Sequence, residues 1–138
     1  MSDAIAETLA AMRPEAVALA EAVSFAVLVD RPLLRKARMQ LVPEADAGTE
    51  ADVWLSDLVK SRSRDGITFT AEAAAALRAR LARDAARTEE AWQLTLAVHD
   101  HLPPTLKLEE KINRLSIDGS EAAAREIDGL LSSVLAAM

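Results

Sequence analysis

The chain has 138 residues, no cysteine and a formal net charge of −6. This length corresponds to one domain with a single core, and the absence of cysteine excludes disulfides, thiol catalysis and thiolate metal sites. Alanine and leucine contribute 29 and 19 of the residues, whereas aromatic residues make up only 3%. Because Ala and Leu favour helices and strands favour β-branched and aromatic side chains, we predict an all-α fold. We expect residues 1–138 to form a single compact bundle of about six to seven helices, either alone or as the terminal module of a longer protein.

The first 30 residues predict two helices. Ser2 is placed to cap a short helix over residues 3–12, and Pro14 suits the first position of the next helix. We expect this second helix to continue to Val29 at the centre of the core, because it is apolar on nearly all sides. The apolar run that ends at Val29 is too short to span a bilayer. We therefore expect a cytoplasmic protein with no membrane partner.

Residues 30–59 predict two more helices, separated by a break. Asp30 can cap the first of them, and the segment 43–48 contains the proline and glycine that interrupt the pattern. Thr49 is predicted to cap the second helix in a near capping box with Asp52. The apolar positions of this helix cover more than one narrow stripe, so we expect it to contact neighbours on two sides.

From residue 61 onward the pattern is helical except at its beginning. Residues 61–66 predict a polar turn, and residues 67–69 are expected to be an extended bridging segment rather than a strand. Thr70 can cap a helical stretch that runs to about Leu102, and two shorter helices divided at Thr88 fit this stretch equally well. The last two helices are expected at residues 106–115 and, after a cap at Ser120, at residues 121–137.

No group of residues has the spacing of a catalytic or metal site. His99 and His101 lie two positions apart on the predicted helix and share no face, so we expect them to serve the helix end, where positive charge is favourable. Glu109 and Glu110 are adjacent and diverge by about 100°. The i, i+4 spacing of Glu110 and Arg114 predicts an ordinary surface contact. We therefore expect no catalytic residue, no metal, no cofactor and no enzymatic activity.

Basic residues are concentrated in the middle of the chain. Residues 31–87 carry eleven basic and eight acidic side chains, whereas both ends are acidic. A positive middle suits the docking of a charged partner protein. The acidic overall charge and the scarcity of aromatic side chains argue against nucleic-acid binding. The predicted partner-docking residues are Arg35, Lys36, Arg38, Glu50, Asp57, Arg62 and Arg64.

Two segments contain short motifs. Residues 43–59, PEADAGTEADVWLSDLV, contain Gly-Thr-Glu-x-x-x-Trp-x-Ser, and residues 101–119, HLPPTLKLEEKINRLSIDG, contain Leu-Pro-Pro-x-Leu-x-Leu-Glu-Glu. Both resemble helical modules of large bacterial defence or conflict-system proteins, over residues 30–120. In those proteins the module sits at one end, and the remainder is an effector or regulator such as a protease-like, formylglycine-generating-enzyme-like or NTPase domain. The resemblance carries no catalytic residue and implies an adaptor, in the manner of bacterial death-domain-like modules.

The sequence therefore predicts a non-catalytic protein–protein interaction module that recruits or regulates an effector in a bacterial defence-type system. The expected partner is a protein domain, and self-association is also open. The alternative is a nucleic-acid- or nucleotide-responsive regulatory helical domain. Trp54 and Trp92 suit either a core or an interface, and we expect both in the core.

Overall fold

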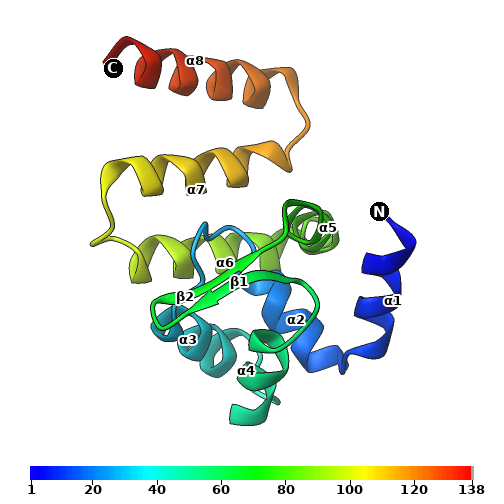
Figure 1. The fold of residues 1–138 in the computed structure, drawn as a ribbon. Helices are drawn as coiled ribbons and strands as arrows, with labels where there is room; N and C mark the ends of the chain where they lie inside the picture. Colours follow the sequence, from blue (N-terminus) through cyan, green and yellow to red (C-terminus); the bar gives the residue numbers. More distant parts are fainter. Residues whose placement is uncertain (138) are drawn as a thin grey trace.

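A computed structural model describes residues 1–137, of which 67% are helical (Figure 1). The predicted helical character is confirmed. Within the described residues there are eight helices rather than six to seven, and a small two-stranded sheet that we did not predict. In chain order the elements are α1 (Asp3–Ala11), α2 (Pro14–Ala22), α3 (Arg31–Leu41), α4 (Ala47–Trp54), β1 (Val59–Ser63), β2 (Gly66–Phe69), α5 (Ala71–Leu81), α6 (Ala85–Val98), α7 (Pro104–Ser116) and α8 (Glu121–Ala137).

Local capping explains where most helices begin. In each case the side-chain oxygen of the cap accepts the backbone N–H three residues later, which satisfies one of the free donors at a helix start. The predicted caps at which this bond is present are Ser2, Asp30, Thr70 and Ser120.

Two predicted helix starts were wrong. Helix α4 begins at Ala47 because Asp46, rather than Thr49, is its cap and accepts the Thr49 N–H. The stretch after Thr70 is divided into two helices, which was one of the two alternatives, but Asp84 rather than Thr88 caps the second. Thr88 is not a cap, because its hydroxyl donates back to the Leu81 carbonyl. In both cases an aspartate slightly earlier in the chain provides the stronger local acceptor.

The second helix ends earlier than predicted. Val29, which we expected at its C-terminal end, pairs with the sheet instead. Helix α2 stops at Ala22, and Val29 forms an antiparallel bridge with Ile67, with backbone hydrogen bonds of 2.8 and 2.9 Å in the two directions. Residues 66–69 therefore form a strand rather than a bridging segment. They pair antiparallel with β1, from Val59 opposite Phe69 to Ser63 opposite Gly66, with a shift of register between Val59 and Ser61. The β-branched residues around Val29 suit this extended pairing.

Gly66 is required where the hairpin meets Val29. Its φ of +154° is one that residues with a side chain rarely adopt, and a Cβ there would lie 2.5 Å from the Val29 carbonyl oxygen.

We expect Gly66→Ala to lower the free energy of unfolding by about 2 kcal/mol, because a backbone atom must move to make room. Chemical denaturation measures this, and Gly129→Ala is the control. Gly129 lies in α8 with open space around its Cβ position, so that substitution should be neutral or slightly stabilising. Equal stability of Gly66→Ala and the wild type would contradict the close approach.

The core is formed by α2, α3, α5 and α6 together with the segment after α2. Phe25 is fully buried, and its ring meets the ring of half-buried Trp92 edge to face with centroids 5.6 Å apart. Glu21 is also buried, and its two carboxylate oxygens accept hydrogen bonds from Arg80 of α5 and Arg87 of α6, each at 3.0 Å. These bonds compensate the buried charge and tie three helices together.

Helices α7 and α8 form a hairpin at one end of the molecule. Figure 1 shows α7 lying between α8 and the remainder, with α4 at the opposite end. In residues 101–137 only Glu110 and Ala123 are buried, so the hairpin adds little to the main core. None of the helices within residues 1–137 is long and apolar enough to cross a membrane.

Candidate docking surface on α4

Leu55, at the C-terminal end of α4, is the most prominent apolar feature of the surface away from the chain ends. It is the C-cap residue of α4 and its side chain is 70% exposed. Leu55 and Ala51 line two separate hollows, one on each side of α4. The exposed edge of α4 is therefore a ridge between two depressions, and we call Ala51 and Leu55 the α4 ridge. An exposed leucine flanked by hollows is a shape that a partner protein can cover.

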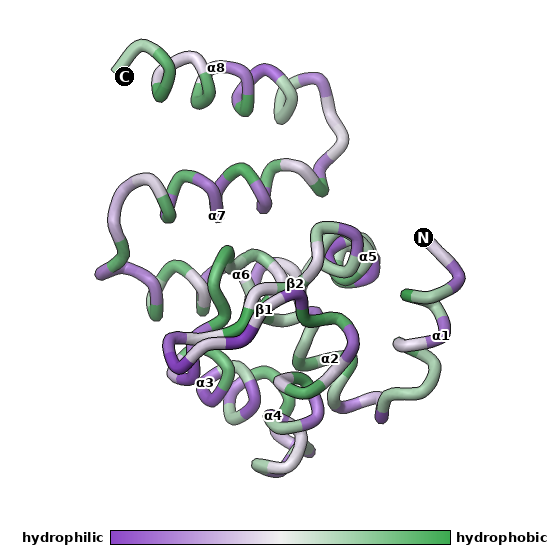
Figure 2. Tube along the Cα trace, viewed as in Figure 1, coloured by the Kyte–Doolittle hydropathy of each residue, from purple (hydrophilic) through white to green (hydrophobic). Residues whose placement is uncertain are grey.

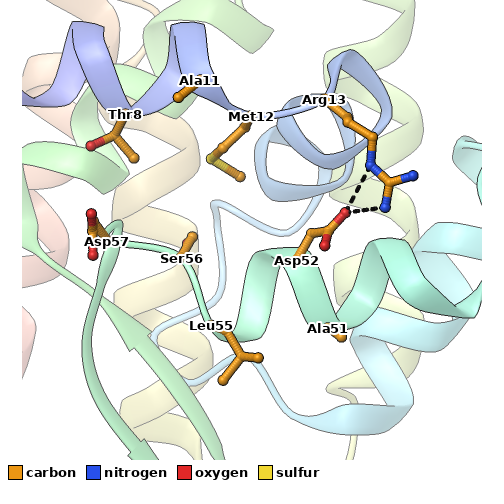
Figure 3. Close-up of a pocket in the computed structure, with 9 residues that line it drawn as sticks. All are labelled: Thr8, Ala11, Met12, Arg13, Ala51, Asp52, Leu55, Ser56 and Asp57. Carbon is orange, nitrogen blue, oxygen red and sulfur yellow. Dashed lines mark hydrogen bonds and ion pairs between the residues drawn. The ribbon is translucent and has the colours of Figure 1, made fainter.

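The first depression, the α1–α4 hollow, has a volume of about 520 Å³. Arg13, which follows α1, hydrogen-bonds through its Nε to Asp52 of α4 at 3.1 Å, and this pair closes one side of the hollow (Figure 3). The pair is solvent-exposed, so it orients the two side chains more than it stabilises the fold. The hollow is lined by Thr8, Ala11, Met12, Arg13, Ala51, Asp52, Leu55, Ser56 and Asp57.

The second depression, the α3–α4 groove, has a volume of about 350 Å³ and is lined by both basic and apolar side chains. Arg31 lies over the ring of Trp54, with its guanidinium carbon 4.2 Å from the ring centroid. Arg35, one turn further along α3, is exposed beside it. Within residues 1–137, neither guanidinium has a hydrogen-bonded or ion-paired partner. The groove therefore combines positive charge with an aromatic and an aliphatic wall.

Trp54 was predicted to be a core residue, and it is half-buried. One part of it packs against the main core and another lines the α3–α4 groove. Leu58, four residues after Trp54, lies beyond the end of α4 and is fully buried. The two side chains therefore do not form one continuous helical face.

Three of the predicted docking residues hold α4 in place. Arg38 Nε donates to Glu50 Oε2 at 2.6 Å, and both side chains are only 19% exposed. Arg62, on β1, donates to the carbonyl oxygen of Trp54 at 2.6 Å, at the end of α4, and to that of Ser56 at 2.9 Å, just beyond it. Arg38, Glu50 and Arg62 thus position the ridge, although Glu50 also lines the groove.

The other four predicted docking residues are exposed, but they do not form one patch. Arg35 lines the α3–α4 groove, whereas Asp57 lines the α1–α4 hollow. Lys36 is exposed on α3 and lines neither depression, and Arg64 lies in the turn between β1 and β2. Their role in docking stays a prediction.

His99 lies in a buried ionic cluster that we did not predict. It is 1% exposed and is the C-cap residue of α6. Its Nδ1 is 2.6 Å from Glu110 Oε2 of α7, and its Nε2 is 3.3 Å from Asp30 Oδ2, the N-cap of α3. Burial alone lowers the pKa of His99, but the two carboxylates outweigh it and raise the pKa to about 9. The imidazole is therefore protonated at neutral pH and links α3, α6 and α7.

The predicted surface contact between Glu110 and Arg114 was wrong. Glu110 is buried and contacts His99, whereas Arg114 Nη2 lies 3.6 Å from Glu89 of α6. Asn113 lies one turn after Glu110 on α7 and also faces the core, where its side chain donates to the Phe25 carbonyl at 3.0 Å. Helix α7 is thus attached to the core largely by polar contacts.

The buried cluster has the geometry of a structural link. The two carboxylates contact opposite nitrogens of the imidazole, so they do not converge on one point where an ion would sit. Within residues 1–137 no group of three or more His, Asp or Glu side chains is arranged to hold a metal ion. A histidine that is 1% exposed is also out of reach of a substrate.

Sequence reasoning missed Leu55 and Arg31 as surface candidates. The apolar positions of α4 exceed one stripe, from which we expected packing on two sides, whereas Leu55 is exposed. Arg31 and Arg35 are spaced i, i+4, which places them on one face. The buried contacts of His99 with Asp30 and Glu110 have no sequence signal, because they join residues 69 and 11 positions apart.

The chain matches no protein-family model, no curated protein and no solved structure.

Proposed function

We propose that this chain is a non-catalytic protein-interaction module that binds a partner protein on the α4 ridge, and that it recruits or regulates an effector in a bacterial defence-type system. The observation that carries the proposal is Leu55, an exposed apolar side chain between two depressions, with the unpaired guanidiniums of Arg31 and Arg35 beside it. An apolar anchor with charged side chains at its rim is typical of protein–protein interfaces. The resemblance of residues 43–59 and 101–119 to modules of defence proteins supports the effector role.

The distribution of the arginines favours a protein partner over the nucleic-acid alternative. Arg80 and Arg87 bind Glu21, and Arg78 donates to the Ser24 carbonyl at 3.4 Å. These side chains are engaged within the fold, so the basic residues do not form a continuous track for phosphates.

Site-specific photo-crosslinking tests the proposal. A photoreactive amino acid placed at position 55, in cells of the source organism, is expected to crosslink one defined protein, because Leu55 would be covered by the partner. The same amino acid at position 96 is the matched control, since Leu96 of α6 is also an exposed leucine, 45% accessible, and lies outside both depressions. Mass spectrometry identifies the crosslinked protein.

Leu55→Asp should lower the affinity for that partner at least about tenfold, because a carboxylate replaces the apolar anchor. Leu96→Asp should leave binding unchanged. No crosslink at position 55, or equal crosslinks at positions 55 and 96, would contradict the proposed docking surface.

A further inference from the structure

Helix α8 has an acidic and apolar face that no other part of the described chain covers. Its inner side, which includes buried Ala123, packs on α7. A different side of α8 carries Asp128, Leu131 and Leu135, which lie at i, i+3 and i+7. Glu121, two turns before Asp128, lies on the same side. Leu131 is 46% and Leu135 71% exposed. We call Glu121, Asp128, Leu131 and Leu135 the α8 stripe.

The hydropathy of α8 changes along its length. Figure 2 shows hydrophilic residues near its start and hydrophobic residues towards its C-terminal end. Within residues 1–137, Asp128 has no ion-pair partner, and Glu121 has only a 3.9 Å exposed contact with Arg125. Such an exposed pair is worth little, so Glu121 remains available for a stronger partner.

The α8 stripe and the α3–α4 groove are complementary in charge and in polarity. The stripe offers carboxylates followed by two leucines, and the groove offers Arg31 and Arg35 beside the apolar walls of Trp54 and Leu55. Arginine binds carboxylates with charge-assisted hydrogen bonds, and an amphipathic helix places its leucines in an apolar groove. The carboxylates of the stripe can meet Arg31 and Arg35, and its leucines can meet the apolar walls of the groove.

The two surfaces cannot meet within one molecule. Helix α8 and helix α4 lie at opposite ends, with α7, α6 and the core between them (Figure 1). Contact between them therefore requires two copies, and each copy keeps one stripe and one groove free. An interface of this head-to-tail kind joins copies into open chains or rings.

We propose that the α8 stripe of one copy docks into the α3–α4 groove of a second copy, so that the module associates with itself head to tail. This inference rests on the proposed function, in that it names the partner of the α4 ridge as another copy of the same module. Copies joined in this way would bring any domains fused to them together.

Light scattering and sedimentation of the full chain test the proposal. The wild-type mass is expected to rise above that of a monomer as the concentration increases, up to on the order of 100 µM, and to fall back when salt is raised, because exposed ion pairs are screened. The groove variant Arg31→Glu/Arg35→Glu and the stripe variant Leu131→Ser/Leu135→Ser should each be monomeric. Arg83→Glu and Leu96→Ser are the matched controls and should associate like the wild type, because both residues are exposed and line neither depression. Circular dichroism melts confirm that each variant is folded.

Mixing the two monomeric variants gives the decisive result. The groove variant keeps an intact stripe, and the stripe variant keeps an intact groove, so an equimolar mixture should form a dimer that grows no further. If two stripes bound each other instead, the groove variant would be a dimer by itself. If two grooves bound each other, the stripe variant would be a dimer by itself.

A wild-type chain that stays monomeric over this concentration range overturns head-to-tail association, as does a mixture of the two variants that stays monomeric. The proposed function is judged separately by the crosslink at position 55. A crosslink to a different protein retains the docking surface and rejects self-association, whereas the absence of any crosslink rejects the docking surface itself.

Discussion

Replacing Glu110 with Ala is expected to lower the free energy of unfolding by about 3–5 kcal/mol, the usual cost of removing one partner from a buried ion pair. His99 is protonated at neutral pH because its pKa is raised to about 9. Without Glu110 its buried imidazolium keeps only the 3.3 Å contact with Asp30. The same substitution also removes a contact between α7 and the core, so loss of structure should begin in the α7–α8 hairpin. Chemical denaturation measures the global effect, and hydrogen exchange of the α7 amides measures the local one.

The neighbouring residue provides a matched control for this prediction. Glu109 has the same side chain and the same helix, but it is exposed. We expect Glu109→Ala to change the free energy of unfolding by less than about 0.5 kcal/mol. If both variants had the stability of the wild type, the buried contact between Glu110 and His99 would make no energetic contribution, and the attachment of α7 would have to come from elsewhere.

The helix starts were predictable because a cap acts over three residues. Asp30 and Thr70 are followed by helical patterns, and in both cases the side chain accepts the expected backbone N–H. The error at α4 was of the same local kind, since Asp46 competes with Thr49 for the cap. Such errors displace the start of a helix by a few residues.

The hairpin was not predictable, because its stability depends on residues distant in the sequence. The segment after Lys60 is polar and short, with the features of a turn. It becomes a strand through pairing with residues 66–69, and Ile67 in turn pairs with Val29 from the end of the apolar run. Sequence patterns around either segment do not show that the two will meet.

The candidate docking surface was predicted in part for a similar reason. The basic helix α3 and the helix that carries Trp54 do form its two sides, and Arg35 lines the groove. The sequence cannot show that Arg38 and Glu50 satisfy each other, because that depends on how α3 and α4 pack. Charge counts therefore indicated the same region as the candidate surface, but they included side chains that stabilise the fold.

The stability of the protein is expected to depend on the protonation of His99, with a fall of about 3 kcal/mol as pH rises from 6.5 to about 9. The pKa of His99 is raised from 6.5 to about 9 in the folded chain, because the contacts with Asp30 and Glu110 outweigh the opposing effect of burial. A group with a raised pKa stabilises the fold fully below its unfolded pKa, and this contribution disappears as pH rises through the folded value.

Asp30 adds the opposite dependence on the acid side. Burial raises the pKa of Asp30, but the 3.3 Å contact with His99 and the hydrogen bond from the Leu33 N–H outweigh it, so the pKa lies below its ordinary value of 3.8. Its contribution is present above pH 3.8 and is lost as the carboxylate becomes protonated at lower pH. The two shifts together place the maximum of this contribution between about pH 4 and 6.5.

Denaturation of the His101→Gln variant at a series of pH values is the appropriate measurement, because His99 is then the only histidine in the chain. Its imidazole can also be followed directly by nuclear magnetic resonance, and it should titrate near pH 9 in the folded protein. In Glu110→Ala the imidazole loses its 2.6 Å partner, so its pKa should fall and the alkaline decrease in stability should become smaller. A free energy of unfolding that stays constant between pH 6.5 and 9, or an imidazole that titrates near 6.5, would show that His99 does not stabilise the fold as a buried cation.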